Sequence, residues 1–182
     1  KFQETKSISP LTFSFIKECL SKYVSNEEKL TEIIDYIKSE RVVKYNKDIK
    51  LGINYEAQIL DIYQQNSYGR AIIYGKEMRD WQVNFFGSKK KKENLAIKNY
   101  QNLNGCVTFV DIKLIEASLF AKDSKCEDAI NLVRTKGNIN KIEISNSLYD
   151  GLDIDFSSLS INEISVNNSM NDCVDLSFGD YE

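Results

Sequence analysis

The sequence contains no histidine among its 182 residues. This absence excludes a serine–histidine triad, a cysteine–histidine dyad and an imidazole metal site within the chain. Proton transfer would depend on Asp, Glu, Lys, Tyr or Cys side chains. A glycine-rich loop for cofactor phosphates is also missing. The chain therefore has carboxylates, amines, phenols and thiols as its only means of acid–base chemistry, and we expect no organic cofactor.

Long apolar runs are absent as well. No run reaches the roughly 18 residues that a membrane-spanning helix needs, so we expect no membrane span. No segment has the pattern of a signal peptide, although a chain that begins at Lys1 could have lost a leader. The cysteines form no CxxC pair, which disfavours a structural zinc site, and we expect free, buried thiols at Cys19, Cys106, Cys126 and Cys173. The sequence does not indicate in which cellular compartment the protein is found.

Charge is unevenly distributed along the chain. The net charge is −3, but residues 123–182 carry twelve acidic and four basic side chains. An acidic C-terminal third repels phosphate backbones, so we expect no nucleic acid partner. The basic run Lys89–Lys92 is interpreted as a solvated loop rather than as a phosphate-binding or membrane-binding patch. A composition rich in lysine, isoleucine and asparagine is typical of AT-rich bacterial genomes.

The last third of the sequence repeats with an offset of 22 residues. A fixed offset is the signature of repeat architectures. The matched positions are mostly identical or conserve apolar character. They include Asp128/Asp150/Asp172, Ile130/Leu152/Val174, Asn131/Asp153/Asp175, Leu132/Ile154/Leu176, Ile142/Ile164, Asn146/Asn168 and Ser147/Ser169.

Each repeat unit reads as short strands separated by turns rich in Asn, Ser and Gly. Segments such as "AINLV", "GLDIDF" and "KIEIS" alternate with period two, and no helical spacing fits between them. The fold class predicted is mainly β, a right-handed parallel β-helix with coils of about 22 residues over 46–182. Asn146 above Asn168 predicts an asparagine ladder at a corner, because Asn tolerates the left-handed backbone. Cys126, Leu148 and Met170 share one position and are interpreted as core residues.

Earlier coils continue the pattern with an offset of 23, which pairs Val107 with Ile130 and Leu119 with Ile142. The segments "GRAIIYG" and "DWQVNFFGS" predict two strands of a preceding coil. "DIKLGI" and "AQILDIY" predict a first coil. Ahead of them, residues 1–45 predict a helical cap, with one amphipathic helix over 9–24 and a second opened by the capping box Ser25–Glu28. The alternative is that this helical pair docks a partner.

Two columns of acidic residues follow from the repeat. If Ile130 and Leu132 point inward, then Asn131, Asp153 and Asp175 face solvent, joined by Asp155. The second column, Asp128, Asp150 and Asp172, lies at the turn that leads into the same strand. Strands about 4.8 Å apart bring such carboxylates within repulsion range. Stacked carboxylates form an acid–base pair or hold a cation such as structural calcium; the alternatives are a solvated acidic face and turn residues that bind backbone N–H groups.

The segment "DGLDIDFSSLSINEISVNNSMNDCVDLSFG" resembles the core motif of polygalacturonase-type glycoside hydrolases, which are right-handed parallel β-helices. The resemblance covers about 30 residues. It places Asp150 and Asp172 on the family's water-activating acids. The family's general acid falls on Asn171, which cannot donate a proton as a carboxylic acid does. Leu148 and Tyr149 replace the family's Asn-Thr, and its later Gly-His-Gly and Arg-Ile-Lys motifs have no counterpart here.

Three functions fit these observations. In the first, a polysaccharide binds the acidic face, with Asp150 and Asp172 as catalytic residues of a divergent or degenerate hydrolase; its other ligands would be Asp128, Tyr149, Asn171, Asp153 and Asp175. In the second, the chain is a non-catalytic scaffold for protein–protein contact or assembly. In the third, it is a cation-stabilised solenoid without enzymatic activity. The sequence stops at "FGDYE", soon after a strand begins a new coil, so we expect Leu176 and Phe178 to lie on an exposed apolar edge. Three explanations are open: a truncated chain, a partner protein that completes the stack, or self-association.

Overall fold

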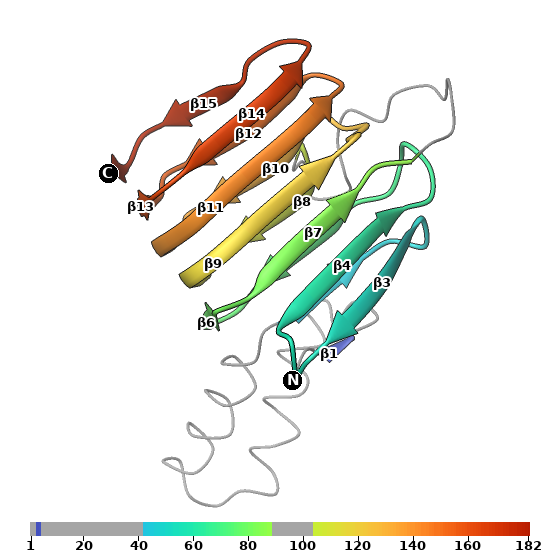
Figure 1. Cartoon of the computed structure of the whole chain (residues 1–182), viewed down its shortest axis with the longest axis horizontal. Helices are drawn as coiled ribbons and strands as arrows, with labels where there is room; N and C mark the ends of the chain where they lie inside the picture. Colours follow the sequence, from blue (N-terminus) through green and yellow to red (C-terminus); the bar gives the residue numbers. More distant parts are fainter. Residues whose placement is uncertain (1–2, 5–41, 89–103) are drawn as a thin grey trace, which may run out of the picture.

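The computed structural model describes residues 3–4, 42–88 and 104–182, which form a parallel β-solenoid of about 5 turns with about 23 residues per turn (Figure 1). The predicted mainly β repeat fold is therefore confirmed. Two sheets wind around one core, and Figure 1 shows the coils following one another from the N-terminal strands to the C-terminal ones. Within these residues no helix is long and apolar enough to cross a membrane.

The first sheet has seven strands in the order β1-β2-β5-β8-β10-β12-β15. Their bounds are β1 Gln3–Glu4, β2 Val42–Tyr45, β5 Ala71–Tyr74, β8 Gly105–Val110, β10 Asp128–Val133, β12 Asp150–Asp155 and β15 Val174–Ser177. From β5 onward all neighbours are parallel. Asp128 lies opposite Gly105 on one side and Asp150 on the other, so a coil spans 23 and then 22 residues as the sequence offsets predict.

The second sheet has nine strands in the order β16-β13-β11-β9-β7-β4-β3, with β14 beside β11 and β6 beside β9. Their bounds are β3 Ile49–Asn54, β4 Ile59–Gln64, β6 Glu77–Arg79, β7 Gln82–Phe86, β9 Lys113–Lys122, β11 Lys136–Ser147, β13 Ser158–Ile161, β14 Ile164–Ser169 and β16 Asp180–Tyr181. The long strand β11 pairs with β13 through its first half and with β14 through its second. Each complete coil thus has three straight segments.

The core consists of apolar columns that run along the solenoid. Ile130 lies opposite Leu152 and Leu132 lies opposite Ile154, and all four side chains are buried. Each such aliphatic side chain contributes about 1.5–3 kcal/mol when it is fully removed from water. A single coil cannot bury these residues alone, so stacking in register is what stabilises the fold.

One corner of the solenoid is a ladder of polar residues with left-handed backbone. Asp123, Asn146 and Asn168 have φ of 58°, 59° and 60°. Asn146 Nδ2 donates to Asp123 Oδ1 at 2.9 Å, and Asn168 Nδ2 donates to Asn146 Oδ1 at 3.1 Å. Asn and Asp visit this backbone region more readily than other residues with a side chain. The predicted asparagine ladder is confirmed, and Asp123 extends it by one coil.

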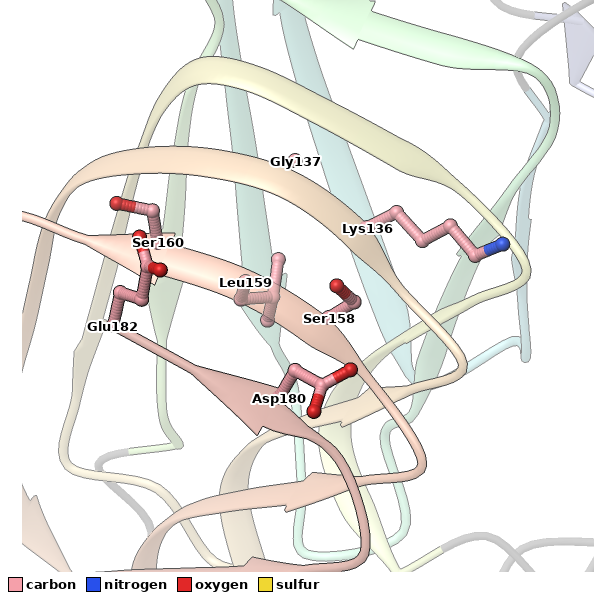
Figure 2. A pocket seen from close by; sticks show the side chains of 7 residues that line it. All are labelled: Lys136, Gly137, Ser158, Leu159, Ser160, Asp180 and Glu182. Atoms are coloured by element: carbon pink, nitrogen blue, oxygen red, sulfur yellow. The ribbon is translucent and has the colours of Figure 1, made fainter.

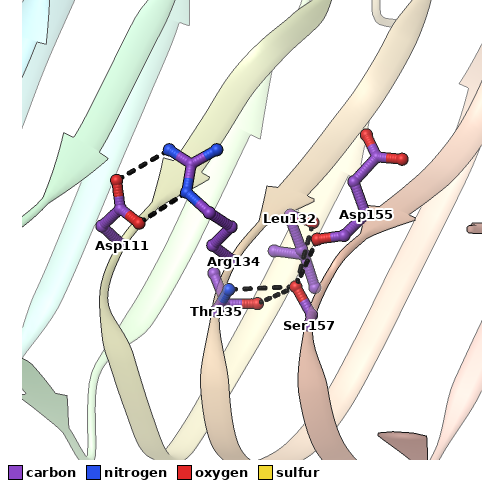
Figure 3. Close-up of polar contacts among 6 residues, drawn as sticks. All are labelled: Asp111, Leu132, Arg134, Thr135, Asp155 and Ser157. Carbon is purple, nitrogen blue, oxygen red and sulfur yellow. Dashed lines mark hydrogen bonds and ion pairs between the residues drawn. The ribbon is translucent and has the colours of Figure 1, made fainter. Parts of the chain in front are cut away.

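A second corner has the same left-handed backbone conformation, but its side chains form an ion pair in place of an amide ladder. Asp111, Arg134 and Phe156 each have φ of 50°. Arg134 binds Asp111 through two contacts, Nε to Oδ1 at 2.7 Å and Nη2 to Oδ2 at 2.8 Å (Figure 3). Just inside this corner, the backbone N–H of Thr135 donates to Ser157 Oγ at 2.9 Å. The ion pair is largely exposed, so it stabilises the corner by no more than about 1 kcal/mol.

The N-terminal strands depart from the coil pattern. β3 pairs with β4 antiparallel, and β2 pairs with β5 antiparallel. The predicted first coil from "DIKLGI" and "AQILDIY" is therefore wrong, although β4 does join the parallel ladder through β7. The cause is a reverse turn in which Asn54 Oδ1 accepts hydrogen bonds from the N–H groups of Glu56 and Ala57, at 3.1 and 3.0 Å. The helices predicted over 9–24 and after Ser25 lie outside the described residues.

The cysteines differ from the prediction. Cys106 and Cys126 are buried as expected, but they form a disulfide with a Cα–Cα distance of 5.3 Å. Such a distance is ordinary for a disulfide, and the bond links β8 to the turn before β10 on the next coil. Cys173 is a free thiol but exposed rather than buried. Met170 is also exposed, so its interpretation as a core residue is wrong.

Candidate functional site

Six aspartates lie close together on the first sheet and form the acidic ladder: Asp128, Asp150, Asp153, Asp155, Asp172 and Asp175. Asp128 pairs in register with Asp150, and Asp153 pairs with Asp175. Asp172 precedes β15, and its backbone N–H donates to Asp150 Oδ1 at 2.8 Å. The two predicted acidic columns are therefore present. Both arise because a 22-residue repeat places matching residues on neighbouring parallel strands.

Asp128, which the sequence places at the turn that leads into the strand, is the first residue of β10 and is 3% exposed. The pKa of its carboxyl is raised to about 8, first by burial and then by the negative charges of Asp153, Glu127, Asp150 and Asp155. Among the described residues, no hydrogen-bond partner reaches its buried Oδ2 atom. A buried carboxylate without a partner is costly, so Asp128 is a carboxylic acid at neutral pH.

Arg70 supplies a positive charge beside Asp128. Its Nη1 donates to the carbonyl oxygens of Ser67 and Gly69, at 2.7 and 2.9 Å. Burial lowers the pKa of the guanidinium to about 10, while the negative charge of Asp128 raises that pKa. The guanidinium is still protonated at neutral pH. Its positive charge favours the ionised form of Asp128 and so opposes the effect of the neighbouring carboxylates.

Asp153 connects the buried and exposed parts of the ladder. The pKa of its carboxyl is raised to about 6, first by burial and then by the charges of Asp155 and Asp175, although a 2.8 Å hydrogen bond from Asn131 Nδ2 acts to lower it. Asn131 itself is 3% exposed, so the prediction that it faces solvent is wrong. The strand β10 is buried along its whole length, and only from β12 onward does the outer face open to solvent.

The residues that the glycoside hydrolase resemblance singles out do lie together. Asn171 Nδ2 donates to Asp150 Oδ1 at 2.7 Å and approaches Asp172 Oδ2 at 3.4 Å. The N–H of Asn171 donates to the carbonyl oxygen of Tyr149 at 3.3 Å, and the Tyr149 side chain is exposed. Asp150 thus accepts two hydrogen bonds that fix the turn before β15. An amide, not a carboxylic acid, occupies the place beside it.

Metal binding at the ladder remains a prediction. In the part of the chain that the structure describes, no three His, Cys, Asp or Glu side chains are grouped so that they could hold a metal ion. Asp150 already uses Oδ1 for Asn171 and the backbone of Asp172. A calcium ion at the ladder would therefore depend on neutral oxygen ligands and water.

A shallow polar groove lies on the second sheet, near the C-terminal end (Figure 2). It has a volume of about 330 Å³ and is lined by Lys136, Gly137, Ser158, Leu159, Ser160, Asp180 and Glu182. Figure 2 shows that these residues come from three successive coils. This groove was not predicted from the sequence. The signal that points to it is the alternation in "SSLSI", which turns Ser158 and Ser160 outward around the buried Leu159.

A second missed surface carries two stacked aromatic rings. Tyr63 on β4 and Phe86 on β7 lie in register, with ring centroids 5.1 Å apart and planes 16° apart. Both side chains are exposed, whereas Ile62 and Phe85 beside them point into the core. The alternation within "DIYQ" and "VNFF" predicts these outward positions, but only the register of β4 with β7 brings the rings together.

Comparison of the chain with protein family models, with curated proteins and with solved structures finds no match. The β-solenoid fold is established by the strand register alone. The resemblance to polygalacturonase-type hydrolases stays a prediction, and the roles that it implies for Asp150, Asp172 and Asn171 carry over only as proposals.

Proposed function

We propose that this protein is a non-hydrolytic glycan-binding solenoid whose ligand is a neutral polysaccharide. The ligand lies over the exposed end of the acidic ladder, across β12 and β15. The observation that supports this most is the row of carboxyl groups at Asp153 and Asp175, one strand spacing apart. Carboxylates accept hydrogen bonds from sugar hydroxyls.

The chemistry of the turn favours binding over hydrolysis. An inverting hydrolase needs a carboxylic acid across the scissile bond from its carboxylate base. At the position that the resemblance gives to this acid stands Asn171, whose amide is hydrogen-bonded to Asp150. The exposed ring of Tyr149 beside this turn offers an apolar surface for a sugar face. The concentration of negative charge disfavours acidic polymers and nucleic acid at this face.

The acidic ladder is tested by replacing Asp153 or Asp150 with asparagine. We expect Asp153→Asn and Asp150→Asn each to lower affinity for a neutral polysaccharide about tenfold, which is the loss of one charged hydrogen bond of about 1.4 kcal/mol. Affinity gel electrophoresis against a panel of neutral polysaccharides measures the effect. The control is Glu56→Gln, which removes the same charge from an exposed turn between β3 and β4. If the two ladder variants are retarded as strongly as the control, the proposal is wrong.

A second candidate function, protein docking at the last coil, is favoured by one observation. The strands β14 and β15 and the residues around them expose large apolar side chains, including Leu176 at 52% and Phe178 at 80%. The Phe178 ring stacks on Phe156 of the preceding coil, with centroids 5.5 Å apart, and leaves its outer side open. Such an apolar edge is typical of surfaces that pair with another chain.

Sedimentation velocity tests this second candidate. We expect the chain to associate with a second copy at micromolar concentration, and Leu176→Asp to make it monomeric because a charge is placed on the apolar edge. Lys47→Asp changes the charge by two units, against one for Leu176→Asp, in an exposed turn before β3, and should leave association unchanged. If the protein without substitutions sediments as a monomer, self-association at this coil is wrong.

A further inference from the structure

We propose that the outer face of the second sheet binds an acidic polysaccharide in which uronic acid residues are spaced by neutral sugars. The site is a cross-strand row formed by Lys50, Tyr63, Phe86 and Lys122, here called the aromatic row. Its residues come from β3, β4, β7 and β9, which Figure 1 shows side by side. The row belongs to a different sheet from the acidic ladder, so this site is independent of the function proposed above.

The centre of the aromatic row is an exposed apolar ridge. The Tyr63 and Phe86 side chains are each 38% exposed, and their nearly parallel rings stack on one another. A ligand that covers the exposed parts of these rings would remove apolar surface from water, which favours binding. The C–H face of a pyranose ring is apolar and flat, so it packs on such a ridge, while the ring hydroxyls remain free for polar contacts.

Polar side chains beside the ridge are fixed before any ligand arrives. Asn84 Nδ2 donates to Asp61 Oδ1 at 2.7 Å, Gln82 Nε2 donates to Asn84 Oδ1 at 2.9 Å, and the Tyr63 hydroxyl donates to Asp61 Oδ2 at 3.3 Å. This network holds Tyr63 in place, which reduces the entropy lost on binding. Opposite Asp61, β3 carries Gly52, and a Cβ atom at that position would lie 3.8 Å from the Tyr63 ring, so the ring rests beside a residue without a side chain.

The charges at the two ends of the row select the ligand. Lys50 and Lys122 are exposed, and neither has an ion-pair partner among the described residues. By contrast Lys141, on the adjacent strand β11, binds Glu143 and Glu163 at 3.1 Å each. The two free lysines therefore present unneutralised positive charge beside the rings.

The distance between the lysines sets the spacing of negative charge on the ligand. Three strand spacings separate β3 from β9, which amounts to about 14 Å between the Cα atoms of Lys50 and Lys122. The ridge between them is uncharged. A polymer with a carboxylate on only some of its sugars matches this pattern. A densely sulfated glycan would place negative charges over the rings and next to Asp61, where repulsion opposes binding.

Isothermal titration calorimetry of the full chain with hyaluronan oligosaccharides, which alternate uronate with neutral sugar, tests the proposal at low ionic strength. We expect binding that weakens as salt is added. Lys50→Ala and Lys122→Ala should each raise Kd about threefold and the double variant about tenfold, as exposed ion pairs predict. Phe86→Leu should raise Kd while the fold persists. The control Lys47→Ala removes an exposed lysine from the turn before β3 and should leave Kd unchanged.

Dextran and heparin supply the outcomes that would overturn the proposal. If uncharged dextran binds as tightly as hyaluronan, or if sulfated heparin binds more tightly, the selection by two spaced lysines is wrong. Hyaluronan binding that is unaffected by the double lysine variant also rejects the site. Asp153→Asn on the acidic ladder should leave hyaluronan binding intact. A failure of one proposed site is thereby separated from a failure of the other.

Discussion

Replacing Asp128 with asparagine is expected to stabilise the protein strongly at pH 8.5 and much less at pH 5. The folded carboxyl has a pKa raised to about 8, whereas an unfolded aspartate ionises near pH 3.9. Between these values the folded state holds a proton that the unfolded state has lost. The stabilisation that this proton gives to the folded state is therefore fully present below about pH 4 and is lost as the pH rises through about 8.

The size of this effect follows from the pKa difference. Each pH unit in that window lowers the free energy of unfolding by up to about 1.4 kcal/mol. Asn is neutral at every pH and similar in shape, so the advantage of Asp128→Asn over the unaltered chain should grow by about 4 kcal/mol from pH 5 to pH 8.5, because about three pH units separate pH 5 from the folded pKa. The other groups that act on Asp128 are Glu127, Asp150, Asp153 and Asp155, and they remain in the variant.

Urea denaturation at pH 5 and pH 8.5 measures the difference. Asp175→Asn is the matched control, because Asp175 is an exposed member of the same ladder. The pKa of Asp153 is raised to about 6, so this residue also lowers stability as the pH rises, by a smaller amount and only up to about pH 6. This loss is present in Asp128→Asn and in the unaltered chain alike. Parallel pH profiles for Asp128→Asn and the unaltered chain would show that Asp128 does not hold a proton in the folded state.

Removal of the Cys106–Cys126 disulfide is the second large expected effect. The bond closes a loop with a sequence separation of 20 residues, for which loop entropy gives about 3 kcal/mol of stabilisation. Cys106→Ser with Cys126→Ser should lower the free energy of unfolding by about that amount. The hydroxyls would also lie at buried positions beside Gln64, whose Nε2 is 3.6 and 3.5 Å from the two sulfurs.

Alkylation and denaturation together check the disulfide. Without reductant, denatured protein should show Cys173 alkylated and Cys106 and Cys126 protected in peptide maps. Cys173→Ser should leave the denaturation midpoint unchanged because that thiol is exposed. Alkylation of Cys106 without reductant would contradict the bond.

The fold was predictable because a solenoid converts sequence offset directly into spatial register. Ile130, Leu152 and Val174 are spaced by 22 residues and lie opposite one another on β10, β12 and β15. Asn146 and Asn168 follow the same rule at a corner. Alternation of apolar and polar residues then assigns the inward positions. Neither step needs knowledge of contacts between distant segments.

The disulfide and the first hairpin could not be predicted in this way, because both break the rule of one coil per repeat. Cys106 and Cys126 are closer in sequence than one coil, so a search by offset places Cys126 with Leu148 instead. The antiparallel pairing of β3 with β4 depends on the turn made by Asn54, which a search for repeats does not detect. The burial of Asp128 was missed for another reason. Alternation shows that a side chain points away from the core, not whether that face is open to solvent.

The candidate site was predicted in position but not in environment. Asp153 and Asp175 stack as the repeat requires. The raised pKa values of Asp128 and Asp153 depend first on their burial, which only the three-dimensional arrangement defines. The aromatic row shows the same limit, since Lys50 enters it through the antiparallel pairing of β3 with β4 that the sequence did not predict.

The most direct test of the stacked architecture is a cross-link between coils. Ser147 and Ser169 are register partners 22 residues apart, with their Oγ atoms 2.7 Å apart. In a Cys173→Ser background, Ser147→Cys with Ser169→Cys should form a disulfide on mild oxidation. The pair Ser145→Cys with Ser169→Cys, two residues out of register, should stay reduced. Oxidation of both pairs alike, or of the second alone, would contradict the stacking of each coil on the next.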